Sequence, residues 1–249
     1  MRPAPPSVVE VSARIEKELR VNGNPQRAVA ERKYLKSDLE FYGASMGAIR
    51  ATVKAFVRGH ASITHDDLIA IVLELWSQPI FERRITAVVL LECCPALLST
   101  RDIPMIEQLI RASRTWALVD GLAVKVTGDL VLRYPSALQT LDRWAIDDDF
   151  WIRRSLLLAH LKLLGEKKGF SSFSRHADSM LSEKELFIRK AIGWVLREVG
   201  KRNPKDVFDW LAPRTHIASG VTMREATKYL DADQRNTLMT AYKAKRPVT

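Results

Sequence analysis

FERRITAVVLL (81–91), WIRRSLLLAHL (151–161) and FIRKAIGWVL (187–196) share one pattern, and the architecture follows from it. In each segment a pair of basic residues stands early in an apolar stretch with helical spacing. TMREATKYL (222–230) is a weaker copy. The first arginines of the four copies are Arg83, Arg153, Arg189 and Arg224, so the gaps between them are 70, 36 and 35 residues. The spacing indicates an internal repeat of about 35 residues, with one altered copy inside the first gap.

A repeat of this length with two short helices per unit is typical of HEAT-like and armadillo-like proteins. Thr64, followed three residues later by Asp67, resembles a capping box before the apolar run LIAIVLELW (68–76). Glycines are only 11 in number and alternating Val/Thr stretches are few, which disfavours an all-β fold. The sequence therefore predicts an all-α, curved α-solenoid. The alternative is an irregular helical bundle whose basic doublets are chance surface charges.

The expected domain organisation is one repeat domain over residues 11–240, with a flexible N-terminal tail at 1–10 and a basic C-terminal tail at 241–249.

No apolar run reaches the roughly 20 residues of a membrane helix. The first residues, MRPAPPSVVE, lack the apolar core of a signal peptide. Adjacent Cys93 and Cys94 lack a CxxC partner or a histidine cluster, so reduced thiols are expected and no metal site. We expect a cytoplasmic, nucleoid-associated monomer.

The net charge of the chain indicates what kind of partner it binds. The chain has 39 Lys and Arg against 29 Asp and Glu, a net charge of +10. A surplus of this size favours a polyanion such as nucleic acid. Repeated basic residues at one register predict a positive stripe along the inner face of the solenoid. A protein-interaction solenoid remains the alternative, because that is the commonest use of such repeats.

The altered copy lies in RTWALVDGLAVKVTGDLV (114–131), where the two basic positions have become Leu118 and Val119. Two residues after the reference position, the other copies hold a small or apolar residue, whereas this copy holds Asp120. Trp116 lies four residues earlier on the same helical face. A single acid among basic copies is suited to a cationic group. The alternative is a surface aspartate paired with a neighbouring Arg or Lys.

Other stretches combine aromatic and basic residues. Lys190, Trp194 and Arg197 share one helical face, opposite an apolar face. Trp194 is then either a core residue with snorkelling neighbours or an aromatic surface for a sugar or base. Trp151 next to Arg153 and Arg154 repeats the theme, as does Tyr34 among Arg32, Lys33 and Lys36. Lys190, Arg197 and Arg153 are therefore candidate DNA-binding residues.

The segments YLKSDLEFYG (34–43), TWALVD (115–120), WIRRSLLLAHLK (151–162) and FIRKAIGWVLRE (187–198) resemble the AlkD-type DNA alkylation-repair glycosylases. The resemblance runs from about residue 15 to residue 230 and is most specific around Trp194. It implies a fold of HEAT-like repeats with duplex DNA in a concave basic groove. The family motif usually reads Trp-Trp-Asp-x-Val-Asp, whereas this chain has Thr115 and Ala117 at the first Trp and the first Asp.

By this resemblance, Asp120 is the catalytic aspartate, and Trp116 and Trp194 lie beside the lesion. Arg154 lies near the phosphates of the lesion, and Tyr34 lies at the groove. The expected substrate is duplex DNA with purines alkylated at N3 or N7, excised with the base largely stacked rather than flipped into a pocket.

This chemistry needs few residues. An N3- or N7-alkylated purine already carries positive charge, so its glycosidic bond has a good leaving group. One carboxylate can stabilise the oxocarbenium-like sugar and position water, and no cofactor is expected. Two alternatives stay open: a catalytically silent protein that recognises distorted or branched DNA, and a glycosylase specialised for bulky adducts of a DNA-alkylating natural product.

Overall fold

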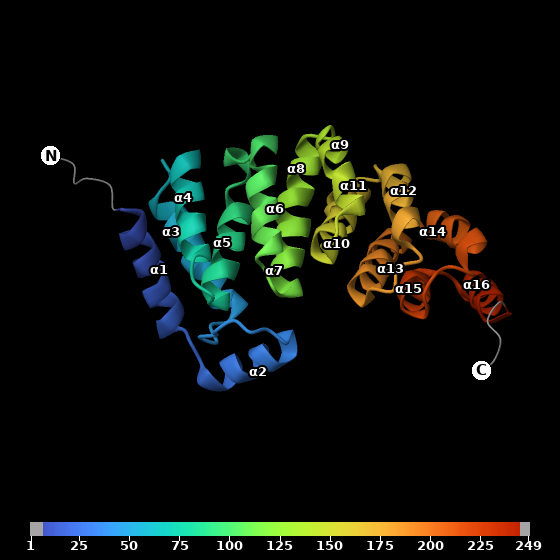
Figure 1. Ribbon diagram of the computed structural model, residues 1–249, viewed down its shortest axis with the longest axis horizontal. Helices are drawn as coiled ribbons and strands as arrows, with labels where there is room; N and C mark the ends of the chain where they lie inside the picture. The colour runs from blue at the N-terminus through green and yellow to red at the C-terminus, as the bar shows by residue number, and fades with distance from the viewer. Residues whose placement is uncertain (1–6, 245–249) are drawn as a thin grey trace. The chain divides into compact units, whose positions relative to one another are not determined.

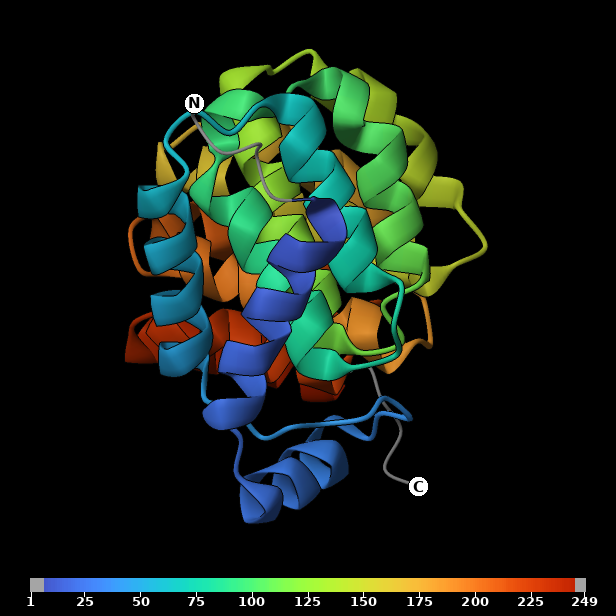
Figure 2. The same cartoon turned by 90° about the vertical axis from the view of Figure 1, so that its left-hand side faces the viewer.

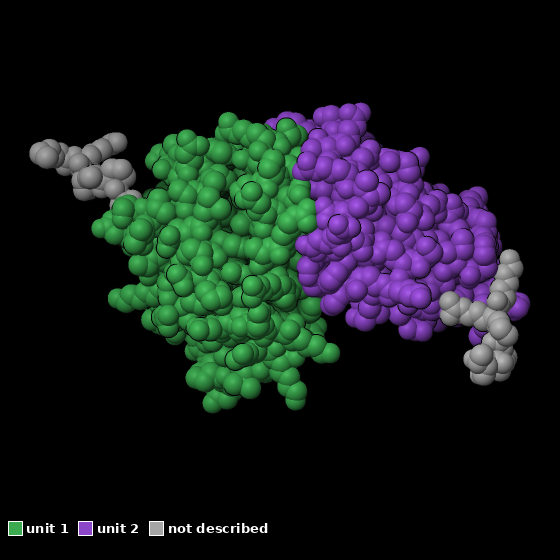
Figure 3. All heavy atoms as spheres, in the orientation of Figure 1, with its two compact units in different colours: residues 1–130 green, residues 131–249 purple. Residues whose placement is uncertain are grey.

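The computed structural model describes residues 7–244, and these residues fold into helices joined by short loops (Figure 1). Contact density divides the chain into two compact units, residues 1–130 and 131–249 (Figure 3). Among the described residues, extended pairing is limited to one isolated parallel bridge between Glu40 and Ile80. The all-α prediction is confirmed.

The first unit contains the longer helices of the N-terminal half. Its elements are α1 (Val8–Val21), α2 (Pro25–Leu35), α3 (Met46–Gly59), α4 (His65–Trp76), α5 (Phe81–Cys93), η1 (Pro95–Leu97), η2 (Thr100–Asp102), α6 (Ile103–Arg111), α7 (Trp116–Asp120) and the π-helix η3 (Gly121–Thr127). Helix α8 (Gly128–Arg133) crosses the boundary between the units. Within the unit, α5 packs against α3, α4 and η3.

The second unit is also built of short helices. Its elements are α9 (Ala137–Leu141), η4 (Asp142–Ile146), α10 (Phe150–Ala159), α11 (Leu161–Gly165), α12 (Phe170–Met180), α13 (Leu186–Gly200), α14 (Pro204–Leu211), η5 (Ala212–Arg214), α15 (Gly220–Ala226), η6 (Thr227–Tyr229) and α16 (Ala232–Ala244). Here α13 is central, because it packs against α10, α14 and α15.

The repeat inferred from the arginines sets the helix starts. Helices α5, α7, α10, α13 and α15 begin at residues 81, 116, 150, 186 and 220, which are 35, 34, 36 and 34 residues apart. The altered copy between Arg83 and Arg153 is therefore a helix start like the others. A side-chain cap also lies where the sequence predicted it: Thr64 and Asp67 form a capping box at the start of α4.

Each unit has an apolar core built from the inward faces of these helices. Leu68, Leu75 and Leu90 are completely buried in the first unit, and Trp144 and Phe173 in the second. Together, such residues account for much of the driving force of folding, because each buried side chain contributes about 1.5–3 kcal/mol. The cysteines pack as expected: Cys94 is buried, Cys93 is half-buried, and both are free thiols.

The helical region extends beyond the expected domain bounds of 11–240. Helix α1 begins at Val8, where Ser7 and Glu10 form a capping box, so residues 8–10 are helical rather than a tail. At the other end α16 continues to Ala244. Residues 1–6 and 245–249 lie outside the described residues. Within 7–244, every helix is too short or too polar to cross a bilayer.

Helix α2 packs differently from its neighbours in the first unit. Figure 2 shows it lying below α1, α3 and α4, joined to them by extended chain. Only Leu35 is buried among its residues, so a shared apolar face does not explain its position. Its attachment instead comes from the segment that follows it, whose Leu39 and Ala44 are buried.

Candidate functional site

Asp120 is the last residue of α7, and the chain continues from it into the π-helix η3. Trp116 begins the same short helix, one turn earlier, and both side chains are half-buried. The corresponding residues of three other copies, Ser155, Ala191 and Ala226, are completely buried. The altered copy thus brings a carboxylate and a tryptophan to a partly open position that elsewhere belongs to the core.

A π-helix follows Asp120 directly in the altered copy. A π-turn holds one more residue than an α-turn, so it changes the direction in which the following side chains point. Gly121 begins it and lies so close to α5 that a Cβ atom there would stand 2.8 Å from Cγ1 of Val88. The altered copy therefore packs tightly on α5 through a glycine. π-Helical turns of this kind are frequent at functional sites.

Tyr34 joins Trp116 in the first unit. The two rings meet edge to face, with centroids 5.6 Å apart and planes at 83°, while 71% of Tyr34 remains exposed. An edge-to-face contact is a favoured aromatic geometry, yet it leaves one face of Tyr34 open. The structure thus brings Tyr34 next to Trp116, one helical turn from Asp120. In the sequence, Tyr34 and Asp120 are 86 residues apart.

A buried carboxylate holds the segment behind Tyr34. Glu82 of α5 is completely buried, and it accepts hydrogen bonds from the backbone N–H groups of Tyr42, Gly43 and Ala44 at 2.9, 2.6 and 3.2 Å. Burial raises the pKa of Glu82, and these N–H donors oppose the rise. Sequence reasoning missed Glu82. The signal was its place in the FERR doublet, where an acid directly precedes the repeated arginine.

In the second unit, α13 has the two faces that the sequence predicted. Ile188, Ile192 and Val195 are buried, whereas Lys190 is exposed and Trp194 is half-buried. Trp194 is therefore partly open to the surface, and its role as an aromatic surface stays a prediction.

Two of the candidate cations of α13 already have neighbours. The Nζ atom of Lys190 lies 5.7 Å from the centroid of the Phe187 ring, a cation–π distance. Arg197 forms an ion pair with Glu225 and lies 3.6 Å from Glu198. Lys190 thus presents the more accessible charge, and Arg197 would have to exchange an acid for a phosphate in order to bind DNA.

Arg154 of α10 is only 5% exposed. Its Nη1 atom donates to the carbonyl oxygen of Phe187 at 2.6 Å, and its guanidinium lies 5.6 Å from the centroid of that ring. The side chain therefore ties α10 to the first turn of α13. Its contact with the phosphates of a lesion stays a prediction.

The first arginines of three copies bind backbone carbonyls. Arg83 donates to the carbonyls of Glu74 and Leu75 at 2.7 and 3.3 Å, at the end of the preceding α4. Arg153 donates to the carbonyls of Asp147 and Asp148, and Arg189 to that of Glu183 at 2.7 Å. Carbonyl groups at a helix end lack intrahelical partners, so an arginine here stabilises the junction between elements.

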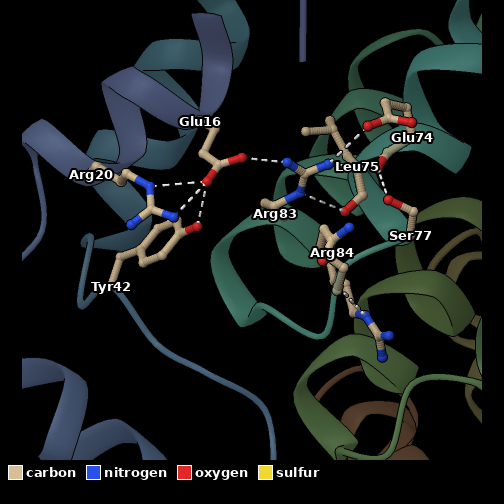
Figure 4. Close-up of polar contacts among 9 residues, drawn as sticks. Glu16, Arg20, Tyr42, Glu74, Leu75, Ser77, Arg83 and Arg84 are labelled. Carbon is tan, nitrogen blue, oxygen red and sulfur yellow. Dashed lines mark hydrogen bonds and ion pairs between the residues drawn. The ribbon is translucent and has the colours of Figure 1, made fainter. Parts of the chain in front are cut away.

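Carboxylates complete these junctions. Figure 4 shows Arg83 between Glu16 of α1 and the end of α4, with Arg20 and Tyr42 on the other side of Glu16. Burial alone would raise the pKa of Glu16, but the hydrogen bonds from Tyr42, Arg20 and Arg83 hold it below its ordinary value. Arg153 forms a two-pronged pair with Glu183, at 3.0 and 2.9 Å. The repeated arginines thus have a structural explanation, and the DNA contact predicted for Arg153 would require it to release Glu183.

Two cavities of the first unit lie away from these residues. One of about 470 Å³ opens between α1 and α3 and is lined by Val11, Ile15 and Phe56 among others. Another of about 450 Å³ lies beside Lys54, Arg58 and Cys93. Neither of these two is lined by Trp116, Asp120 or Tyr34. Within residues 7–244, no group of three or more His, Cys, Asp and Glu side chains could hold a metal ion.

Comparison with known proteins gives a family match and structural matches. The model of a family described as DNA alkylation repair enzyme matches residues 15–230. A solved structure described as "Predicted DNA alkylation repair enzyme from Enterococcus faecalis" is 24% identical and has a TM-score of 0.77; the match covers 85% of this chain and 98% of that one. At this identity the likeness shows a shared fold, and it confirms the helical-solenoid class. No curated protein sequence matches.

Proposed function

Because the chain belongs to the DNA alkylation repair enzyme family, we propose that it is a glycosylase that hydrolyses the glycosidic bond of positively charged N3- or N7-alkylated purines in duplex DNA. Family membership itself gives the repair of alkylation damage and, with it, DNA binding. The observation that carries the finer proposal is the placement of Asp120. It is a half-buried carboxylate, one turn after Trp116, at a position of the repeat where the other copies hold a buried small or apolar residue.

The chemistry follows from charge. The alkylated base leaves as a neutral purine, so no acid is needed to protonate it, and positive charge develops on the deoxyribose instead. At about 4 Å and an effective dielectric constant of ~20, a carboxylate attracts a unit positive charge by roughly 4 kcal/mol. That corresponds to roughly a thousandfold in rate. In this proposal Asp120 stabilises the sugar cation and orients the water that attacks it.

Each unit offers an accessible aromatic side chain to DNA. Trp116 and Tyr34 in the first unit, and Trp194 in the second, are all partly or largely exposed. Their faces can attract a cationic nucleotide through cation–π interaction. We propose that the base stays largely stacked in the duplex during excision, because Trp116 and Tyr34 lie partly open at the surface, where they can contact the sugar without enclosing the base. An open site also tolerates adducts of different size.

Asp120→Asn tests the proposal. The substitution keeps the shape of the side chain and removes its charge, so release of 7-methylguanine and 3-methyladenine from alkylated duplex should slow by about 10²–10³-fold. Affinity for the duplex should stay equal or rise slightly, because a negative charge leaves a DNA-binding surface. Chromatography of the released bases and a separate binding titration measure the two effects.

Asp129→Asn is the matched control. Asp129 is another half-buried aspartate, nine residues further along the chain in α8. Its substitution should leave base release within about twofold. Full activity of Asp120→Asn would remove Asp120 from the catalytic role. DNA binding by the wild-type protein without release of any alkylated base would favour the catalytically silent alternative.

A further inference from the structure

Three charged residues flank the Tyr34–Trp116 pair in the first unit. Asp38 follows α2, four residues after Tyr34, and Arg114 precedes Trp116 by two residues. Nη1 of Arg114 donates to Oδ2 of Asp38 at 2.9 Å. Both side chains are about two-thirds exposed, at 66% and 63%. Surface pairs of this kind contribute little to stability, so a competing anion can replace the carboxylate.

Arg84 of α5 supplies a second guanidinium. It is half-buried, and its Nε and Nη1 atoms donate to the carbonyls of Gln78 and Ala112 at 3.1 and 2.8 Å. Its guanidinium also lies 5.5 Å from the ring centroid of Trp76. Figure 4 shows Arg84 extending away from the Arg83 ion pairs. The two carbonyls and the ring fix the direction of Arg84 before any ligand arrives.

The charges around Asp38 do not balance. Burial lowers the pKa of Arg84, the positive charge of Arg114 lowers it further, and Asp38 opposes both. Two arginines therefore share the field of one exposed carboxylate. A group with more negative charge and a fork-shaped set of oxygen atoms would satisfy them better, and a phosphate diester offers such oxygens.

The backbone of Arg114 supports a role for its side chain. Its φ angle is +53°, in the left-handed region that favours glycine. A residue other than glycine in this conformation costs of order 1–3 kcal/mol, and such residues cluster at functional sites. The turn that leads into Trp116 thus carries an arginine where glycine would be easier.

We propose that Arg84 and Arg114 form a phosphate clamp for the DNA strand that lies against Tyr34 and Trp116, and that Asp38 holds Arg114 until a phosphate displaces it. This inference rests on the proposed function, since it assumes that DNA binds at Trp116. Asp38 then acts as a resident competitor.

Competition makes a sharp prediction for an unalkylated duplex. Asp38→Asn should bind it about two- to fivefold more tightly at low salt, because the competitor is lost. Arg114→Gln should bind it more weakly and should reduce the slope of log K against log[salt] by about one. In the Arg114→Gln background, Asp38→Asn should have no further effect. Arg84→Gln should reduce the slope by about one more.

Asp209→Asn is the matched control. Asp209 forms an exposed ion pair with Lys205 on α14, so this variant changes the net charge equally without touching the clamp. The inference is overturned if Asp38→Asn binds no more tightly than Asp209→Asn, or if its gain persists beside Arg114→Gln. Asp38 and Arg114 are exposed, so the cycle is decisive even where Arg84→Gln unfolds.

Base release is measured separately, so that the two proposals can fail independently. If the Asp38→Asn and Arg114→Gln variants behave as predicted but no alkylated base is released, the phosphate clamp is supported and the glycosylase activity is contradicted. Release of alkylated bases with no response to Asp38→Asn or Arg114→Gln would do the opposite.

Discussion

Substitution of Trp194 tests whether this side chain serves the surface or the core. It is half-buried on α13, whereas Trp144 in the same unit is completely buried. Trp194→Ala should therefore slow base release strongly while lowering the free energy of unfolding by only about 1 kcal/mol, a typical value for a substitution outside the core. Trp144→Ala should cost about 3–5 kcal/mol. Denaturant unfolding of both variants measures the difference, and equal losses would return Trp194 to the core.

Gly43 is the residue on which the position of Tyr34 depends. Its φ angle is +78°, and a Cβ atom there would stand 2.0 Å from the carbonyl oxygen of Asn24, the N-cap of α2. Gly43→Ala should destabilise the protein by at least about 2 kcal/mol, through strain and displaced backbone. It should also slow base release, because α2 carries Tyr34.

Gly59→Ala is the control for Gly43. Gly59 ends α3, and nothing lies within 4 Å of the position that a Cβ atom would take. Alanine there should be neutral or stabilising by up to about 1 kcal/mol. Thermal unfolding of the two alanine variants compares a required glycine with an optional one. A Gly43 variant as stable as the wild type would show that α2 does not rely on this contact.

On the scale of the helices, a buried polar cluster joins α10 to α12 and η4. His160 follows α10 and is completely buried, and its Nδ1 atom lies 2.9 Å from the carbonyl oxygen of Leu156. Nε2 of His160 faces Nδ1 of His176 at 3.4 Å, and Nε2 of His176 lies 2.7 Å from Asp142. Arg175 also pairs with Asp142. The cluster thus holds His176 and Arg175 on one carboxylate, with His160 packed behind His176.

This cluster predicts a pH dependence of stability. Burial lowers the pKa of His160 to about 4, and it lowers that of His176 as well. The unfolded state has the ordinary histidine pKa of about 6.5, so it takes up protons first as the pH falls. The stabilisation is complete above about pH 6.5 and declines toward pH 4, by roughly 3 kcal/mol for His160 alone.

Urea unfolding at pH 7.5, 6 and 5 measures this decline. His160→Gln cannot take up a proton, so its free energy of unfolding should fall less steeply between pH 6.5 and 4, by about one proton in the slope. Identical slopes in the two proteins would show that His160 is not protonated on unfolding.

Some features of the helices can be predicted from sequence, and others cannot. The starts of α5, α10, α13 and α15 follow from repeated local patterns, because apolar spacing and a basic doublet recur in each copy. The partners of the arginines do not follow. Arg83 binds Glu16, 67 residues away, and backbone carbonyls that carry no sequence signature. A doublet that predicts a positive stripe is therefore also compatible with a structural junction.

The residues of the candidate site also differ in how far sequence could predict them. Asp120 and Trp116 could be selected from sequence, since the break in the repeat and the resemblance to a family both point to them. The contact of Tyr34 with Trp116, the anchoring by Glu82 and the left-handed backbone of Arg114 arise from packing between distant segments. Such contacts have no periodic signal, so they are visible only in the folded chain.

For the whole molecule, the net charge of +10 predicts salt-dependent DNA binding. Each phosphate contact releases condensed counterions, so about six contacts would lower affinity about 10³-fold between 50 and 200 mM salt. Lys190 is exposed on α13, and Lys190→Gln should reduce the log–log slope by about one. Lys205→Gln on α14 removes a lysine already paired with Asp209 and should leave the slope unchanged. Fluorescence anisotropy with a short duplex measures both, and a salt-independent affinity would contradict the prediction.

The π-helix η3 also has a consequence for the repeat as a whole. An α-helix that gains one residue, while its two ends stay packed, must absorb that residue as a wider turn. The neighbouring helix starts lie 35 residues before and 34 residues after that of α7, so the copy as a whole is no longer than the others, and the wider turn is balanced within it. One copy of a repeat can thus change its winding directly after a candidate functional residue while the spacing between copies keeps the fold.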